Sequence, residues 1–327
     1  MANPEHLATI KHGVAVWNEW YKKHKRVTPD LAQANLSNLN LSGINLKKAN
    51  LHHANLSGAD LSQADLDCAD LEGANLLKTD LQEANLKGAN LDYVIFSQAK
   101  INSKTIIATK NLRVYEIVNN LIKNRDFSGI DLSNSNLFRA NLGNANLDCA
   151  NLANVNLNSA NLSNAYLHKA NLNQANLQNA NLTNAYFSQA DLSNANLNNA
   201  LCDGTYFKGA ELKFTDFKAT RFSQKTMIDL KWYSVWEIVN CGAVGKNLSG
   251  ADLSNANLRE ANFEGANLTN AKLNHAILRH SNLNLANLTN TNLVGADVSG
   301  VDLAQANLKG TKLRAIISDR HTKLSTV

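Results

Sequence analysis

Apolar residues return along most of the chain with a period of five. In the stretch DLSQADLDCADLEGANLLKTDLQEANL, residues 60–86, a leucine stands at every fifth position and the residue two before it is nearly always alanine. On an α-helix five residues advance the chain by about 500°, so successive leucines fall about 140° apart and form no stripe. On a flat strand an odd spacing sends successive leucines to opposite faces. Neither element buries this pattern.

A backbone that turns a corner once per repeat does bury it, because each five-residue side then points its leucine inward again. Four such sides close a coil of about twenty residues, and coils stack at the ~4.8 Å spacing of a parallel ladder. A narrow interior filled at protein density needs one large and one small residue per side, as in Ala54 and Leu56. The Asn or Asp between them suits a corner, since its side chain bonds nearby backbone. The two remaining positions vary and are polar, as on a solvated wall.

The repeat A-(N/D)-(L/F)-x-x resembles the pentapeptide-repeat family. The resemblance covers about three-quarters of the chain, and departures such as Cys202 for the central leucine or Thr79 for the small residue are local. Members of that family fold as right-handed quadrilateral β-helices. The resemblance therefore implies an all-β solenoid.

Two interruptions divide the repeats into three blocks. The sequences of the two interruptions match at an offset of 121 residues. Lys104-Thr105 aligns with Lys225-Thr226, and the sequence EIVN occurs at 116–119 and at 237–240. A long repeat is thus superimposed on the short one. The predicted segments are an N-terminal helix and linker at 1–30, blocks at 31–106, 127–227 and 248–313, helical insertions at 107–126 and 228–247, and a tail at 314–327.

A short helix is predicted before every block. The N-terminal helix has Asn3 as its cap and Pro4 in its first turn, and Gly242 is a stop for the helix of the second insertion. An open β-helix end exposes unpaired backbone and a bare core. We therefore expect each helix to cover the first coil of the block that follows it. The alternative is one continuous tube from which the two insertions bulge out.

Residues about twenty apart stack in a column on a four-sided coil, which allows a search for sites. His52, Glu72 and Asp92 share such a column and form the best cluster of potential ligands. The favoured interpretation is a solvated wall, since metal sites need three or four converging ligands with further support. The sequence contains no phosphate-loop motif, and a filled convex tube offers no cleft. Cys202 points inward and is expected to be unreactive. We expect no enzyme, metal or cofactor.

All four tryptophans lie in the helical segments. Covering a coil accounts for Trp17 and Trp236. Trp20 and Trp232 fit the same helix faces less well, and tryptophan is enriched at interfaces. The candidate interaction surface therefore comprises His52, Glu72, Asp92, Trp20 and Trp232.

The net charge of +5 is unevenly distributed. Residues 31–101 include five lysines against eight acidic residues, whereas residues 127–222 and 248–313 are neutral. Some members of the resembled family mimic duplex DNA and inhibit type II topoisomerases, which requires densely acidic walls. An inhibitor or protector of DNA gyrase is thus the alternative function. Direct nucleic-acid binding by KKHKR, 22–26, is not favoured, because basic runs commonly end helices.

A structural or protein-interaction scaffold is the predicted function. The sequence shows no catalytic motif. The repeated residues build a tube whose flat polar walls can bind a protein partner. The N-terminal segment has no apolar run and the four cysteines form no CxxC pair. We therefore expect no membrane span and a reduced, cytoplasmic protein.

Overall fold

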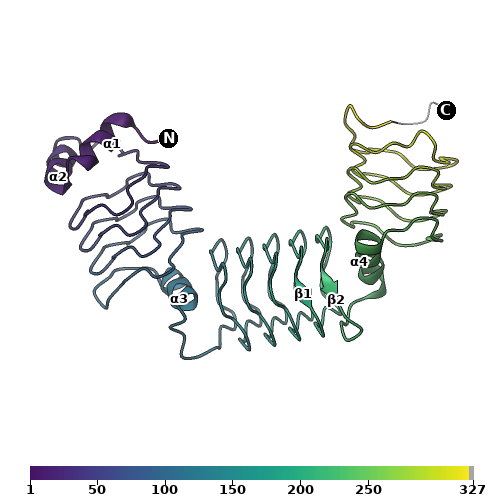
Figure 1. Cartoon of the computed structure of the whole chain (residues 1–327), viewed down its shortest axis with the longest axis horizontal. Coiled ribbons are helices and arrows are strands. Elements are labelled where there is room, and N and C mark those ends of the chain that lie inside the picture. The colour runs from purple at the N-terminus through teal and green to yellow at the C-terminus, as the bar shows by residue number, and fades with distance from the viewer. Residues whose placement is uncertain (324–327) are drawn as a thin grey trace. The chain divides into compact units, whose positions relative to one another are not determined.

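The computed structural model describes residues 1–323. Within them, the regular elements in chain order are α1 Pro4–Lys11, α2 Val14–Lys23, α3 Thr109–Val118, β1 Leu201–Cys202, β2 Arg221–Phe222 and α4 Leu230–Cys241 (Figure 1). The chain forms two compact units, the first made of 1–125, 131–141 and 154–157, and the second of the remaining described residues. None of the helices within 1–323 has the length and apolar character needed to cross a bilayer.

Parallel bridges join residues twenty apart, as in Asn55–Asn75, and this spacing confirms coils of four five-residue sides. Leu56 N donates to Asn75 O and Asn75 N to Ala54 O, both at 2.9 Å. The bridged runs extend over 30–106, 126–227 and 247–323. Each side contributes a single bridged residue, so only β1 and β2 reach the length of a strand.

The interior holds one large and one small residue per side, as predicted. Leu56 and Ala54 are fully buried, and the same is true of the pairs around them. At about 25 cal/mol per Å² of apolar surface, burial of each leucine contributes about 1.5–3 kcal/mol. This repeated burial is the main stabilising interaction of the tube.

The predicted corner is wrong by two positions. Asn55, between the small and the large residue, is bridged in the middle of a wall, and the chain turns at Ser57 and Gly58. The second turn residue takes a positive φ, 67° at Gly58 and 54° at His53. The predicted bond to nearby backbone is confirmed, because Ser57 N donates to Asn55 Oδ1 at 3.2 Å. The Asn or Asp thus lies in the wall and stabilises the following turn through its side chain. The two variable positions form the corner.

The N-terminal segment contains two helices where one was predicted. Asn3 caps α1 as expected, with Glu5 N donating to its Oδ1 at 2.9 Å. The chain breaks at Gly13, whose φ of 105° and ψ of 166° suit only glycine. The apolar spacing continues across the break, which is why the sequence pattern does not reveal it.

Side chains of α1 and α2 form hydrogen bonds with backbone groups of the first coil, which has no preceding coil to bond to. Asp30 N donates to His6 Nδ1 at 2.9 Å, and Asn45 N donates to Asn18 Oδ1 at 2.8 Å. Trp17 is fully buried, and its Nε1 donates to Asn45 O at 2.7 Å. In later coils the equivalent groups bond to the neighbouring coil. The N-terminal helices therefore cover the block that follows them.

The side chains of α3 reach both blocks: Lys110 Nζ lies 3.4 Å from Ser133 Oγ of the following block, whereas the C-terminal end of the helix contacts the block before it. Asn119, at its C-terminal end, donates from Nδ2 to Phe96 O at 3.1 Å and accepts from Gln98 N at 2.6 Å. Tyr115 packs edge-on against Phe96. These contacts lie in the last coil before the helix, because the open end there presents both a donor and an acceptor that one amide satisfies.

α4 makes the same contacts with the coil before it. Asn240 Nδ2 donates to Phe217 O at 3.0 Å, and the Trp236 ring stacks on Phe222 at 4.8 Å. Gly242 ends the helix as predicted, with φ 74°. A lysine reaches the following repeats as in α3, since Lys231 Nζ lies 3.0 Å from Ser254 Oγ. The insertion helices were expected to cover the first coil of the block that follows them. One lysine of each helix reaches that block, but the asparagine and aromatic contacts are with the coil before the helix.

The predicted tail, 314–327, is partly a continuation of the coil. Ile317 is bridged to Asp297 and Lys323 to Asp302. Thr322 closes a turn by donating to Val298 O at 3.1 Å, as Thr105 and Thr226 do at the corresponding places. The loss of the five-residue spacing hid this third copy of the turn. Residues 324–327 of the predicted tail lie outside the described residues.

Candidate functional site

His52 and Glu72 lie side by side on one wall of the first run of coils, and Asp70 joins them. One ligand atom of each side chain lies within 4.8 Å of the others, and all three residues are half-buried. His52 and Glu72 occupy the same turn position of successive coils, whereas Asp70 is the bridged residue two positions before Glu72. The sequence search compared only residues twenty apart and therefore missed Asp70.

Asp92, the third residue of the predicted column, has a different partner. Its Oδ1 lies 3.7 Å from Lys110 Nζ of α3. It does not belong to the group formed by His52, Asp70 and Glu72. Of the three residues in the predicted column, only His52 and Glu72 therefore have side chains that lie close together.

The two candidate tryptophans differ in exposure. Trp20 is half-buried among aromatic rings, with His6, Trp17 and His24 at centroid distances of 4.8, 5.0 and 4.9 Å. Trp232 is 7% exposed and lies on the buried face of α4, with Lys231 Nζ over its ring. Trp232 therefore leaves little surface for a partner, contrary to its place in the predicted interaction surface.

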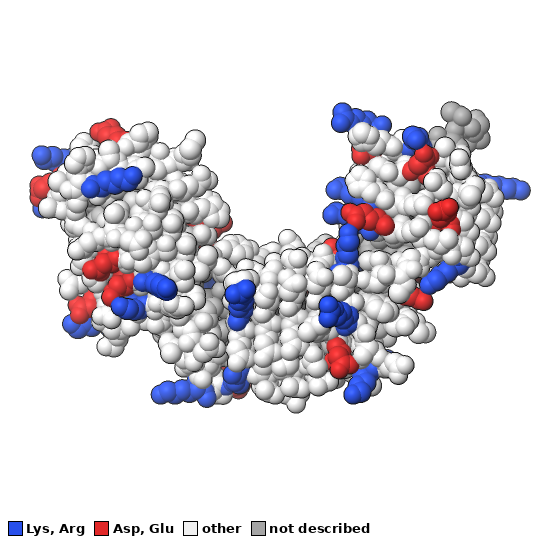
Figure 2. Space-filling view, in the orientation of Figure 1, with Lys and Arg blue, Asp and Glu red and all other residues white. Residues whose placement is uncertain are grey.

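Acidic and basic side chains alternate over the surface. On the face drawn in Figure 2, red and blue residues are interspersed and form no continuous acidic stripe. Lys218 and Glu260 lie 2.6 Å apart, and their hydrogen bond raises the pKa of Lys218 and lowers the pKa of Glu260. Exposed pairs of this kind contribute little stability. Their effect is to neutralise the walls locally.

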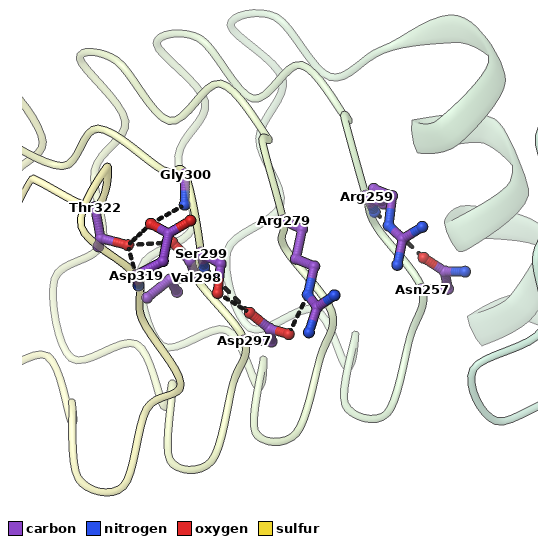
Figure 3. A network of polar contacts seen from close by, with 9 residues as sticks. All are labelled: Asn257, Arg259, Arg279, Asp297, Val298, Ser299, Gly300, Asp319 and Thr322. Carbon is purple, nitrogen blue, oxygen red and sulfur yellow. Dashed lines mark hydrogen bonds and ion pairs between the residues drawn. The ribbon is translucent and has the colours of Figure 1, made fainter.

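Several groups of polar contacts lie in the last run of coils, and Figure 3 shows the residues that form them. Arg279 Nε donates to Asp297 Oδ2, and Ser299 donates from both N and Oγ to Asp297 Oδ1. Burial by itself would raise the pKa of Asp297, but the hydrogen bonds from Ser299 and Arg279 outweigh it and lower that pKa. Asp319 accepts from Gly300 N at 2.9 Å. These carboxylates are fully engaged in holding turns.

Neither Cys202 nor Cys68 has the environment of an activated nucleophile. Cys202 is buried as predicted, and burial raises the pKa of its thiol strongly. Cys68 is exposed, yet its hydrogen bond to Asp67 raises its thiol pKa as well. A raised pKa disfavours the reactive thiolate.

A column of tyrosines is the main exposed feature that the sequence search missed. Tyr166, Tyr186 and Tyr206 are bridged in succession, and Met227 continues the column. The rings of Tyr186 and Tyr206 stack at 4.6 Å, and Tyr166 is 57% exposed. The signal was present as three tyrosines at intervals of twenty residues. It was overlooked because only charged residues and histidines were searched by column.

The profile of the family "Pentapeptide repeats" matches the chain in eight copies, over residues 30–63, 64–102, 123–148, 145–184, 160–199, 185–224, 247–284 and 281–317. The chain belongs to the pentapeptide-repeat family. This pentapeptide-repeat protein accordingly has the right-handed quadrilateral β-helix of its family. No curated protein matches it.

Several solved pentapeptide-repeat structures are similar to this one. HetL, described as involved in heterocyst differentiation regulation in the cyanobacterium Nostoc sp. strain PCC 7120, is 24% identical, with 94% of this chain and 97% of HetL covered and a TM-score of 0.25. The protein alr5209 from Nostoc PCC 7120 is 39% identical over 29% of this chain and 84% of its own, with a TM-score of 0.19. QnrB1, described as a plasmid-mediated fluoroquinolone resistance protein, is 18% identical over 61% of this chain and 88% of its own, with a TM-score of 0.24.

Proposed function

We propose that this pentapeptide-repeat protein is a non-catalytic scaffold whose tyrosine wall binds a protein partner. The observation that carries this proposal is the column of Tyr166, Tyr186 and Tyr206, which presents aromatic surface and hydroxyl groups from a rigid ladder. Tyrosine is enriched in protein interfaces because it offers a large contact area with few rotatable bonds. A wall built only for solvent needs no such column.

The scaffold consists of three blocks with helical caps. The bridges among the described residues stop at Ile106 and resume at Asp126, then stop at Met227 and resume at Asn247. Side chains of the helices satisfy ladder groups through Asn119 and Asn240 at the ends of the first two runs, and through Asn18 at the start of the first run. Such caps prevent edge-to-edge pairing of coils, which keeps the walls available for a partner. The reduced cytoplasm is the proposed location.

DNA mimicry is the second candidate, and the first block is what favours it. Asp60 and Asp80 are bridged in one column, and residues 31–101 have a net charge of −3. Lys100 follows in that same column, and Lys47 neutralises Asp67 nearby. B-DNA carries one charge per ~1.7 Å of its axis, far denser than this wall. The scaffold is therefore the better supported function.

A pull-down with an internal control tests the proposal. The tagged full chain is crosslinked gently in its native host, and captured proteins are identified by mass spectrometry. We expect a partner that is retained by the variant Asp191→Ala/Glu211→Ala and lost by Tyr186→Ala/Tyr206→Ala. The two pairs occupy the same position of the repeat on neighbouring walls of the same coils. The purified partner must then bind the wild type and not the tyrosine variant.

Two results would count against the scaffold. A partner that is lost equally from both variants would show that the tyrosine column is not the specific binding surface. Inhibition of gyrase supercoiling in vitro that disappears with Asp60→Asn/Asp80→Asn would establish mimicry in its place.

A further inference from the structure

An imidazole and two carboxylates meet on a rigid wall. The ligand atoms of His52, Asp70 and Glu72 lie within 4.8 Å of one another. Their backbones are held by the ladder, since Leu51 N donates to Asp70 O at 2.7 Å and His53 N donates to Glu72 O at 2.8 Å. The coil spacing therefore sets the distances between these groups, and little ordering is needed before they bind a common ligand.

The next coil supplies a residue that orients both carboxylates. Asn90 Nδ2 lies 3.1 Å from Asp70 Oδ1 and 3.4 Å from Glu72 Oε2. One amide thus turns the two carboxylates toward the same side. Outer groups of this kind orient metal ligands in known sites, and their loss typically weakens metal binding about 10–100-fold.

The charge at this place is uncompensated within the described chain. Neighbouring carboxylates are paired, Asp67 with Lys47 and Asp92 with Lys110. Neither Asp70 nor Glu72 forms an ion pair with a Lys or Arg of residues 1–323. Two carboxylates at short range repel each other, and a cation bound between them would relieve that repulsion. This imbalance is independent of the geometry and also indicates a cation.

The fold itself does not require these side chains. At the offset of 121 that relates the long repeats, Asn173, Asp191 and Ser193 occupy the positions of His52, Asp70 and Glu72. That stretch forms the same coils, with Asn171 bridged to Asp191. Histidine and glutamate are therefore additions of the first block, made on a wall that folds without them.

We propose that His52, Asp70 and Glu72 bind a divalent transition-metal ion, with Zn²⁺ as the expected ion. Imidazole nitrogen together with carboxylate oxygen suits Zn²⁺ and similar ions, and solvent completes the coordination of an open three-ligand site. Mg²⁺ prefers oxygen ligands alone in an octahedral arrangement. The imidazole of His52 therefore makes the site selective for Zn²⁺ over Mg²⁺. Asn90 acts as a positioning residue.

The test is calorimetric titration of the full chain with ZnCl₂, repeated with MgCl₂. We expect one saturable Zn²⁺ site in the wild type that is weakened at least tenfold by His52→Ala and by Glu72→Gln, with little response to Mg²⁺. Asn90→Ala should weaken it to a smaller extent. His280→Ala is the matched control, because it removes another turn histidine next to a glutamate, Glu260, and should leave the affinity within twofold.

Circular dichroism and thermal unfolding of each variant without metal verify that the solenoid is intact. An intact wild type without a saturable Zn²⁺ site would overturn the proposal. So would a site that keeps its affinity in His52→Ala, or one that is lost equally in His280→Ala, since either result would locate the ion elsewhere.

Discussion

Threonine at the small inward position has a hydrogen-bonding role that its size alone does not suggest. Thr79 is fully buried and donates its hydroxyl to Leu56 O at 2.8 Å. The same bond recurs at Thr205, Thr215, Thr220 and Thr291. Ser281 stands at an equivalent position, but its buried Oγ has no partner in the described chain. We therefore expect replacement by alanine to change the stability in opposite directions at Thr79 and at Ser281.

Replacing Ser281 by alanine should stabilise the protein by about 1 kcal/mol or leave its stability unchanged, because a buried hydroxyl without a partner is removed. Thr79→Ala should cost about 1–2 kcal/mol, since both a hydrogen bond and a buried methyl group are lost. Urea unfolding followed by circular dichroism compares the two variants with the wild type. An equal loss of stability in both would contradict this account of the inward position.

Thiol reactivity should follow burial. Cys68, Cys149 and Cys241 are exposed, whereas Cys202 fills the place of a central leucine and has a raised pKa. Under native conditions iodoacetamide should modify the three exposed cysteines and leave Cys202 unmodified, and all four should react in denaturant. Mass spectrometry of tryptic peptides measures this. Native modification of Cys202 at a rate similar to Cys149 would show that the core opens readily.

The EIVN segments of α3 and α4 end in an asparagine with a defined task. Asn119 and Asn240 each donate to a backbone carbonyl of the coil before the helix, at Phe96 and Phe217. Asn119 also accepts from Gln98 N. The match between the two insertions in the sequence is thus explained by one shared contact, in which an amide replaces the missing neighbour of a coil.

Asn119→Ala should expose the end of the first run of coils. We expect faster hydrogen exchange at the Gln98 amide and a loss of about 1–2 kcal/mol, because a partner of the ladder is removed. Asn240→Ala should have a smaller effect, since its contact with the backbone of the coil is a donated bond only. Exchange measured residue by residue distinguishes a local opening near residue 98 from a general loss of protection, which would contradict a capping role.

The acid sensitivity of the solenoid follows from carboxylates that hold turns throughout it. Hydrogen bonds from Ser128 lower the pKa of Asp126, and the bond from Gly300 N lowers the pKa of Asp319. A carboxyl whose pKa is lowered by folding favours the folded state above its unfolded pKa of about 3.9, and that contribution is lost as the pH falls through the folded value. Many repeats have asparagine at the bridged position, which does not titrate.

The melting temperature should therefore be nearly constant from about pH 7 to 5 and fall below about pH 4. Asp126→Asn, which restores the asparagine of other repeats, should reduce the steepness of that fall. Thermal unfolding followed by circular dichroism at a series of pH values measures it. A melting temperature that rises on acidification would show that carboxylate repulsion outweighs these hydrogen bonds.

The period of five determined the coil, its four sides and the inward pair, because every repeat places the same residue types in the same local environment. The match between the two insertions showed the internal repeat of 121 residues. The cap at Asn3 and the stop at Gly242 were equally readable, since each depends on neighbours in the chain. The sequence also brought His52 and Glu72 together in one column, without Asp70 and without a metal ion.

Tertiary structure alone decided the features that join distant segments. Asn55 proved to be a wall residue because the turn is set by the backbone two positions later. Asp70 lies near His52 because it is bridged to Asn50, two residues before His52. Asn119 bonded to the coil before its helix, and Lys323 extended the ladder beyond the last regular repeat. A five-residue pattern specifies which side chains face inward. It does not specify which open end a helix meets, since that depends on hydrogen bonds between groups that the sequence keeps apart.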